Sequence, residues 1–77
     1  MFDKDNLLTF LKLFEGKVEA IIFAHHEFPI NVCVSTKKAS IEKIVESFKI
    51  LYWSIWDNCE IFQINFSPEN EITIFFR

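Results

Sequence analysis

The order in which two hydrophobic periods alternate along the chain constrains its fold more than any other feature. Over residues 4–15 large apolar residues recur at helical spacing, and from Lys17 onward the period changes to two. One helical segment followed by two strand segments occurs again over residues 40–77. We therefore predict the order helix, strand, strand, helix, strand, strand in a single domain of residues 1–77.

Residues suited to helix ends mark both helical segments. Asp3 and Ser40 carry side-chain oxygens that accept hydrogen bonds from the first turn of a helix. Gly16 is the only glycine, and it stands where a left-handed residue would end the first helix. The second helix is predicted to present one wide apolar arc formed by Ile41, Ile44, Val45, Phe48, Leu51, Tyr52, Ile55 and Trp56.

The strand segments are predicted to form two hairpins. Pairing Phe23 with Cys33 keeps the alternation of the first two strands in phase and puts Ile22 on the same face as Val34. In the second hairpin, Asn70 suits the left-handed position of the turn. The expected pairs there are Phe62 with Phe76, Ile64 with Ile74 and Phe66 with Ile72.

These elements predict an α+β fold of αββαββ order, a two-layer sandwich. One four-stranded antiparallel sheet would carry both helices on a single face, with the strand order left open. Besides the helix stripes, the predicted core contains Val18, Ala20, Ile22, Ala24, Val32, Val34, Phe62, Ile64, Phe66, Ile72, Ile74 and Phe76.

The other face of this sheet is predicted to be unusually apolar. It would present Glu19, Ile21, Phe23, His25, Asn31, Cys33, Ser35, Ile61, Gln63, Asn65, Thr73 and Phe75. A solvated face of an antiparallel sheet normally carries polar residues. Large exposed apolar patches mark interaction sites, so we expect a contact surface formed by Ile21, Phe23, Ile61 and Phe75.

A second apolar spot is predicted on the polar side of the second helix. Ile50 and Trp53 lie there among charged residues, with Glu46 and Asp57 beside them. An uncovered edge strand would be a third adhesive element, because it can pair with a strand of another chain. The alternative is that these are single exposed apolar residues, which are common and carry no function.

The amount of apolar material supports contact with a partner. Hydrophobic residues make up 51% of the 77 residues, and ten residues are phenylalanine. A chain of this size removes only about 63% of its unfolded surface from water. We therefore expect some of these side chains to remain outside the core.

Charge and hydropathy exclude several classes of protein. Eight Lys and Arg against eleven Asp and Glu give a net charge of -3, without a basic stripe for a phosphate backbone. We predict no direct nucleic-acid binding. The sequence has no apolar run of the ~20 residues that span a bilayer and no signal-like start. We expect no membrane association, a cytoplasmic location, and reduced cysteines.

Residues with reactive or metal-binding side chains are few. His25, His26, Cys33 and Cys59 are the only set that resembles a metal site, but adjacent residues of a strand point to opposite faces. On the predicted open face His25 and Cys33 would be diagonal neighbours, without an orienting carboxylate. A single glycine cannot build a phosphate-binding loop. We predict no metal, no cofactor and no enzymatic activity.

The sequence therefore predicts a small non-enzymatic protein that binds and masks a larger protein. Small inhibitors, immunity proteins and phage anti-defence proteins share its size and acidity, and a nucleic-acid-handling target would offer a basic surface. The alternative is a self-associating domain that forms a homodimer for a structural or assembly role. The expected contact residues are Ile50, Trp53, Glu46, Asp57, Ile21, Phe23, Ile61 and Phe75.

Overall fold

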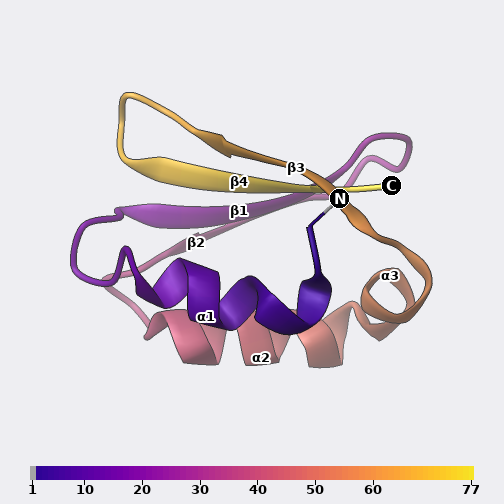
Figure 1. Cartoon of the computed structure of the whole chain (residues 1–77), viewed down its shortest axis with the longest axis horizontal. Helices are drawn as coiled ribbons and strands as arrows, with labels where there is room; N and C mark the ends of the chain where they lie inside the picture. The colour runs from indigo at the N-terminus through magenta and orange to yellow at the C-terminus, as the bar shows by residue number, and fades with distance from the viewer. Residues whose placement is uncertain (1) are drawn as a thin grey trace.

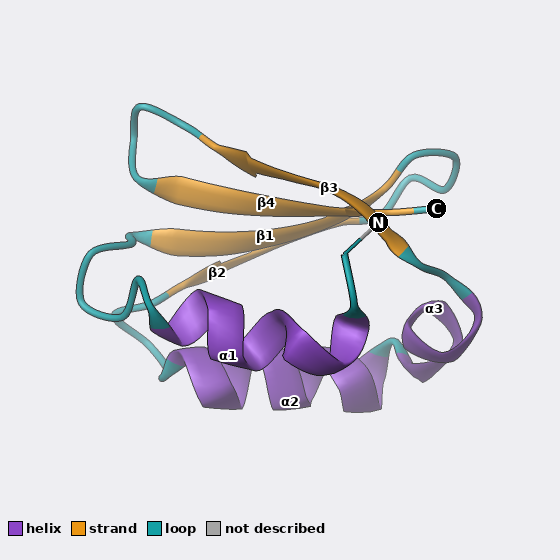
Figure 2. Cartoon of the chain, viewed as in Figure 1, coloured by secondary structure: helices purple, strands orange, loops and turns teal. Residues whose placement is uncertain are grey.

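The helices of this protein lie together on one face of a β-sheet (Figure 1). The computed structural model describes residues 2–77. Within that range the helices are α1 (Leu7–Lys12), α2 (Ile41–Leu51) and α3 (Trp53–Asn58), with a 3-10 turn at Lys4–Asn6 before α1. The strands are β1 (Ala20–His25), β2 (Asn31–Ser35), β3 (Ile61–Phe66) and β4 (Glu71–Phe76). The predicted α+β class and the two-layer arrangement are confirmed (Figure 2).

The sheet is mixed, so the prediction of a wholly antiparallel sheet was wrong. Its strand order is β2-β1-β4-β3, with antiparallel hairpins on both sides of a central parallel pair, β1 and β4. A helix that runs back along a sheet returns the chain in its original direction, so β3 runs the same way as β2. Each hairpin reverses the chain once, and the two inner strands must therefore be parallel.

The inward face of β1 is the opposite of the predicted one. Phe23 pairs with Val32 and Ile21 pairs with Val34, which is one residue away from the predicted register. Ile21 and Phe23 are therefore fully buried beneath the helices, whereas Ile22 lies half-buried on the other face. Because side chains alternate with period two, a slip of one residue exchanges the two faces of a strand.

A bulge at Phe62 produces the same reversal at the start of β3. Ile61 pairs with Phe76 and Gln63 pairs with Phe75, so Phe62 is the extra residue between them. Ile61 is fully buried, although the sequence predicted it on the open face, and Phe62 leaves the predicted core. Beyond the bulge the predicted pairs Ile64 with Ile74 and Phe66 with Ile72 are confirmed, although Phe66 is 54% exposed and lies outside the core.

The second predicted helix is broken at Tyr52, where the backbone has φ −122° and ψ 44°. An unbroken helix over residues 41–58 would be about 27 Å long, whereas a strand of six residues spans about 20 Å. The break turns α3 across the end of the core, where Ile55 is buried. Leu51 leaves the predicted apolar arc and is 74% exposed.

Local signals at the ends of the elements act as predicted. Asp3 accepts a hydrogen bond from the backbone of Asp5, and Ser40 accepts one from the backbone of Lys43. Gly16 and Asn70 have positive φ values of 82° and 62°. These four positions depend on neighbouring backbone atoms only, so a local argument describes them.

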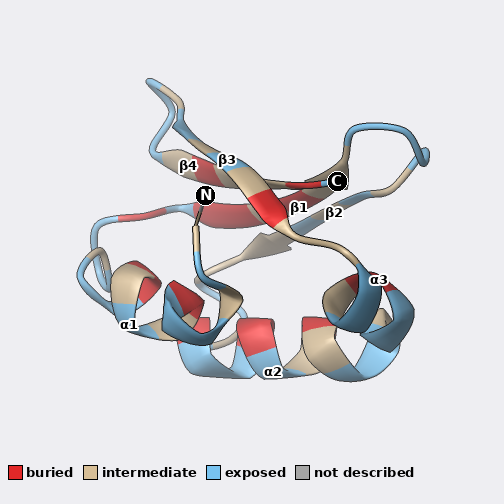
Figure 3. Ribbon diagram, turned by 45° about the vertical axis from the view of Figure 1, so that its right-hand side comes forward, coloured by how far each residue is buried: buried red, intermediate tan, exposed pale blue. Residues whose placement is uncertain are grey.

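The core lies between the helices and the inner face of the sheet (Figure 3). The predicted core positions Ile72, Ile74 and Phe76 of β4 are confirmed by exposures of 1% or less. Phe48 of α2 stacks on Phe76, with ring centroids 5.4 Å apart. Val32, Val34 and Ile64 are half-buried and complete this core from the two outer strands.

Candidate protein-interaction surfaces

Three large apolar side chains are exposed at the junction of α2 and α3. Ile50 is 69% exposed, Leu51 74% and Trp53 62%. The break at Tyr52 accounts for Leu51, because α2 ends at this residue and α3 starts at Trp53. Ile50 and Trp53 lie on the surface as the sequence predicted. Leu51 was missed, since helical periodicity assigned it to the buried arc.

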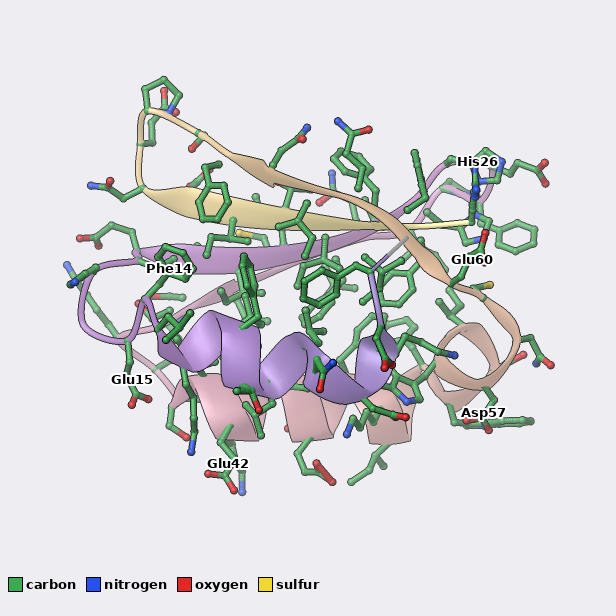
Figure 4. All side chains as sticks on the ribbon, in the orientation of Figure 1. Phe14, Glu15, His26, Glu42, Asp57 and Glu60 are labelled. Carbon is green, nitrogen blue, oxygen red and sulfur yellow. The ribbon has the colours of Figure 1, made fainter. Side chains whose placement is uncertain are left out.

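Acidic residues stand one helical turn from these apolar residues. Glu46 precedes Ile50 by four residues in α2, and Asp57 follows Trp53 by four in α3, so each pair shares a helix face. We call Glu46, Ile50, Trp53 and Asp57 the outer stripe. Figure 4 places Asp57 on the helix side of the molecule, away from the sheet.

The charges of the outer stripe are largely free. Glu46 Oε2 lies 4.0 Å from Lys49 Nζ, a distance at the limit of an ion pair, and the side chain of Glu46 is 60% exposed. Asp57 forms no ion pair within residues 2–77. Lys49 also lies over the ring of Trp56, with 4.9 Å from its Nζ to the ring centroid. Along the chain, the stripe therefore presents two exposed apolar side chains flanked by two exposed carboxylates.

An apolar groove runs between α2 and β2, the strand at one edge of the sheet. We call it the edge groove; its volume is about 100 Å³. Lys43 is the only charged residue in its lining. The exposed side chain of Leu51 forms part of its wall, so the groove adjoins the outer stripe. Its other lining residues are Phe23, Val32, Val34, Ala39, Ile44, Ser47, Phe48 and Tyr52.

The open face of the sheet carries other apolar residues than the sequence predicted, namely the half-buried Ile22 and Phe62 together with Phe75. Ile21, Phe23 and Ile61 are absent from it because they are fully buried, which leaves Phe75 half-buried there as the remaining residue of the expected patch. Phe62, displaced by the bulge, packs against Phe75 with 6.1 Å between ring centroids. The guanidinium of Arg77 covers Phe62 at 5.4 Å and forms a 2.8 Å ion pair with Glu60. This face is therefore a weaker candidate than the outer stripe.

Aromatic side chains also gather where α1 meets β3. Phe10 contacts Phe2 and Phe14 with centroid distances of 5.1 and 5.4 Å, and Phe14 contacts Phe66 at 5.1 Å. Figure 4 shows Phe14 between α1 and the sheet. Phe10 and Phe14 belong to the helical apolar spacing over residues 4–15, and Phe66 was predicted in the core; here the three form a cluster that is only partly covered.

His25 is paired with Cys59, and Cys33 lies elsewhere. The Nε2 atom of His25 is 3.4 Å from the Sγ atom of Cys59. The Nδ1 atom accepts hydrogen bonds from the backbone N–H groups of Glu27 and Phe28, at 3.1 and 3.2 Å. The ring proton is therefore on Nε2 and points at the sulfur. In this tautomer His25 can donate to Cys59 but cannot take its proton, so the pair lacks the base of a nucleophilic thiol site.

Groups that would bind a metal or cross a membrane are not found in the described part of the chain. Within residues 2–77 no cluster of three or more His, Cys, Asp or Glu side chains could hold a metal ion. None of the helices in that range combines the length and the hydropathy needed to traverse a bilayer. Searches of protein-family models, curated proteins and solved structures found no match to this chain.

Proposed function

We propose that this chain is a small non-enzymatic binding protein that covers a surface of a larger protein through its outer stripe. The observation that carries this proposal is the exposure of Trp53 and Ile50, 62% and 69%, on helices whose opposite sides are buried. Tryptophan is the residue type most enriched among those that dominate binding energy in protein interfaces. The mode of action is that of inhibitors, immunity proteins and phage anti-defence proteins, which act by steric cover.

Charge supports a basic partner surface. The chain has a net charge of -3, and Glu46 and Asp57 stand on either side of the apolar pair. Carboxylates around an apolar anchor favour partners whose rim is positive and disfavour acidic ones. A nucleic-acid-handling protein offers such a surface, whereas nucleic acid itself would be repelled. We place the protein in the cytoplasm, where the free thiols of Cys33 and Cys59 remain reduced.

The test is affinity capture with matched bait proteins. Trp53→Ala removes the central anchor, and Leu13→Ala removes an equally exposed apolar side chain on the turn after α1, where Leu13 is 69% exposed. We expect wild type and Leu13→Ala to retain the same partner. Trp53→Ala should weaken its binding by about 2 kcal/mol, which is about 30-fold.

Stability and salt dependence complete the test. Both variants should unfold within about 0.5 kcal/mol of wild type, because surface substitutions rarely change stability by more. Binding should weaken steeply as ionic strength rises, since exposed charge pairs are screened beyond ~10 Å at 0.1 M salt. Equal loss of binding in both variants, or binding independent of salt, would contradict the proposal.

A further inference from the structure

The two edges of the sheet differ in how well they are protected. At the β3 edge the bulge interrupts the strand, and the backbone N–H of Phe2 donates to the carbonyl of Ile61 at 3.4 Å. At the β2 edge Asn31–Ser35 forms a regular strand without proline, bulge or charged residue. Natural proteins block open edges with those devices because an unpaired strand invites another strand. Figure 1 shows β2 as the outermost strand on the side of α2.

The sequence of β2 is close to symmetric about its central residue. It reads Asn-Val-Cys-Val-Ser, so an antiparallel copy centred on Cys33 would place Val32 opposite Val34 twice. Residues directly opposite in an antiparallel pair lie on the same face. The valines of both copies would then extend the helix-covered face, while both cysteines would lie on the open face. From this geometry we propose that β2 pairs with β2 of a second copy about a two-fold axis through Cys33, and that the two edge grooves close against each other.

The helix layer fits this arrangement. Two strands span about 10 Å, which is close to the diameter of one helix. One helix therefore covers two strands, and α2 of each copy would lie beside α2 of the other across the axis. The side chains that meet there come from the groove wall, namely Leu51, Ser47 and the stem of Lys43. The small Ser47 side chain lies between the other two and allows a close approach.

The strand edge of β2 and the edge groove together can bury the area that a stable dimer requires. A stable interface buries at least about 1,000 Å² in total, or about a tenth of the 4977 Å² surface of each copy. A five-residue strand edge alone contributes too little. Burial of Leu51, which is 74% exposed, and closure of the groove supply the apolar part.

Charges beyond the strand ends are complementary in the same register. Pairing about Cys33 brings the start of β2 in one copy next to its end in the other. Lys37 and Lys38 in the turn after β2 then lie opposite Pro29 and Phe28, close to Glu27 in the loop before β2, once on each side of the axis. The side chains of Glu27 and Lys37 are 69% and 81% exposed. At present Glu27 Oε1 lies 3.4 Å from His26 Nε2, and Lys37 Nζ lies 3.7 Å from Glu19 Oε2. Lys38 forms no ion pair with any residue from 2 to 77.

This dimer does not depend on the proposed function. Trp53 and Asp57 of the outer stripe lie on α3 and do not line the edge groove, so a dimer would present two copies of them to partners. Loss of binding in Trp53→Ala tests the stripe, and solution mass tests the edge. Either proposal can therefore fail without the other.

The first measurement is solution mass by sedimentation over a dilution series. We expect twice the chain mass of 9.2 kDa at high concentration. Cys33→Lys puts like charges opposite each other on the exposed face and should weaken dimerisation at least about tenfold. Gln63→Lys is the matched control, an exposed strand position on the other edge, and should leave the mass unchanged. A monomeric wild type, or a dimer that tolerates Cys33→Lys, overturns the proposal.

The second measurement traps the dimer of the wild-type chain by oxidation of its cysteines. Opposed residues of an antiparallel pair have Cα atoms about 4.5–5.5 Å apart, within the range that a disulfide bridges. Diamide takes one hydrogen from each of two thiols and becomes a hydrazine, leaving an intermolecular disulfide. We expect linked dimers from wild type and from Cys59→Ser, and none from Cys33→Ser. Linking through Cys59, or failure to link a native wild-type sample, contradicts the register about Cys33.

Discussion

The ring of Phe23 lies flat on the ring of Phe48, with centroids 4.0 Å apart and planes inclined by 11°. This contact joins the middle of β1 to the middle of α2, and both side chains are at most 3% exposed. It holds the helix layer over the parallel pair of central strands. It also shows which face of β1 points inward.

Phe48→Ala is expected to destabilise the protein by about 3–5 kcal/mol, because it removes a buried ring and leaves a cavity between Phe23, Tyr52 and Phe76. Urea unfolding followed by tryptophan fluorescence measures the change. Phe28→Ala is the control with the same change of chemistry at a residue that is 52% exposed. It should cost no more than about 1 kcal/mol. Similar losses in the two variants would mean that the stack adds nothing to stability.

Glutamate substitutions at two adjacent residues of β1, made one at a time, distinguish the two faces of this strand. Ile21→Glu would place a carboxylate at a fully buried position and should prevent stable folding, a loss of more than about 4 kcal/mol. Ile22→Glu changes a half-buried residue of the open face and should leave a folded protein. Circular dichroism melts of both variants make the comparison. The register of β1 with β2 would be wrong if Ile22→Glu unfolded and Ile21→Glu did not.

Gly16→Ala is expected to destabilise the protein by about 1–2 kcal/mol through backbone strain alone. Gly16 has a φ of +82°, and an added Cβ would meet no atom within 4 Å, so steric crowding contributes nothing. Gly16→Asn should cost less than the alanine variant, because asparagine tolerates the left-handed region better. Thermal unfolding of the three proteins gives the ranking. An alanine variant as stable as wild type would contradict the role of this residue.

Sequence reasoning identified only some of the candidate contact residues. Ile50 and Trp53 were found because they interrupt a polar helix face, and that argument needs nothing beyond a local period of 3.6 residues. Leu51 was missed because the same period assigned it to the core. In the structure the helix breaks at Tyr52, and Leu51 is exposed. Ile21, Phe23 and Ile61 were assigned to the wrong face. The open-sheet surface expected from them is therefore mostly absent.

Sequence alone determined the features that depend on neighbouring atoms along the chain. These are the order of helices and strands, the caps at Asp3 and Ser40, and the left-handed residues Gly16 and Asn70. The tertiary structure decided which face of β1 is buried. The run Ala-Ile-Ile-Phe-Ala is apolar on both faces, so its sequence does not indicate which face turns toward the helices. It also decided the bulge at Phe62, the parallel central pair and the break at Tyr52. Each of these depends on packing between segments far apart in the chain, which a local pattern of residues does not contain.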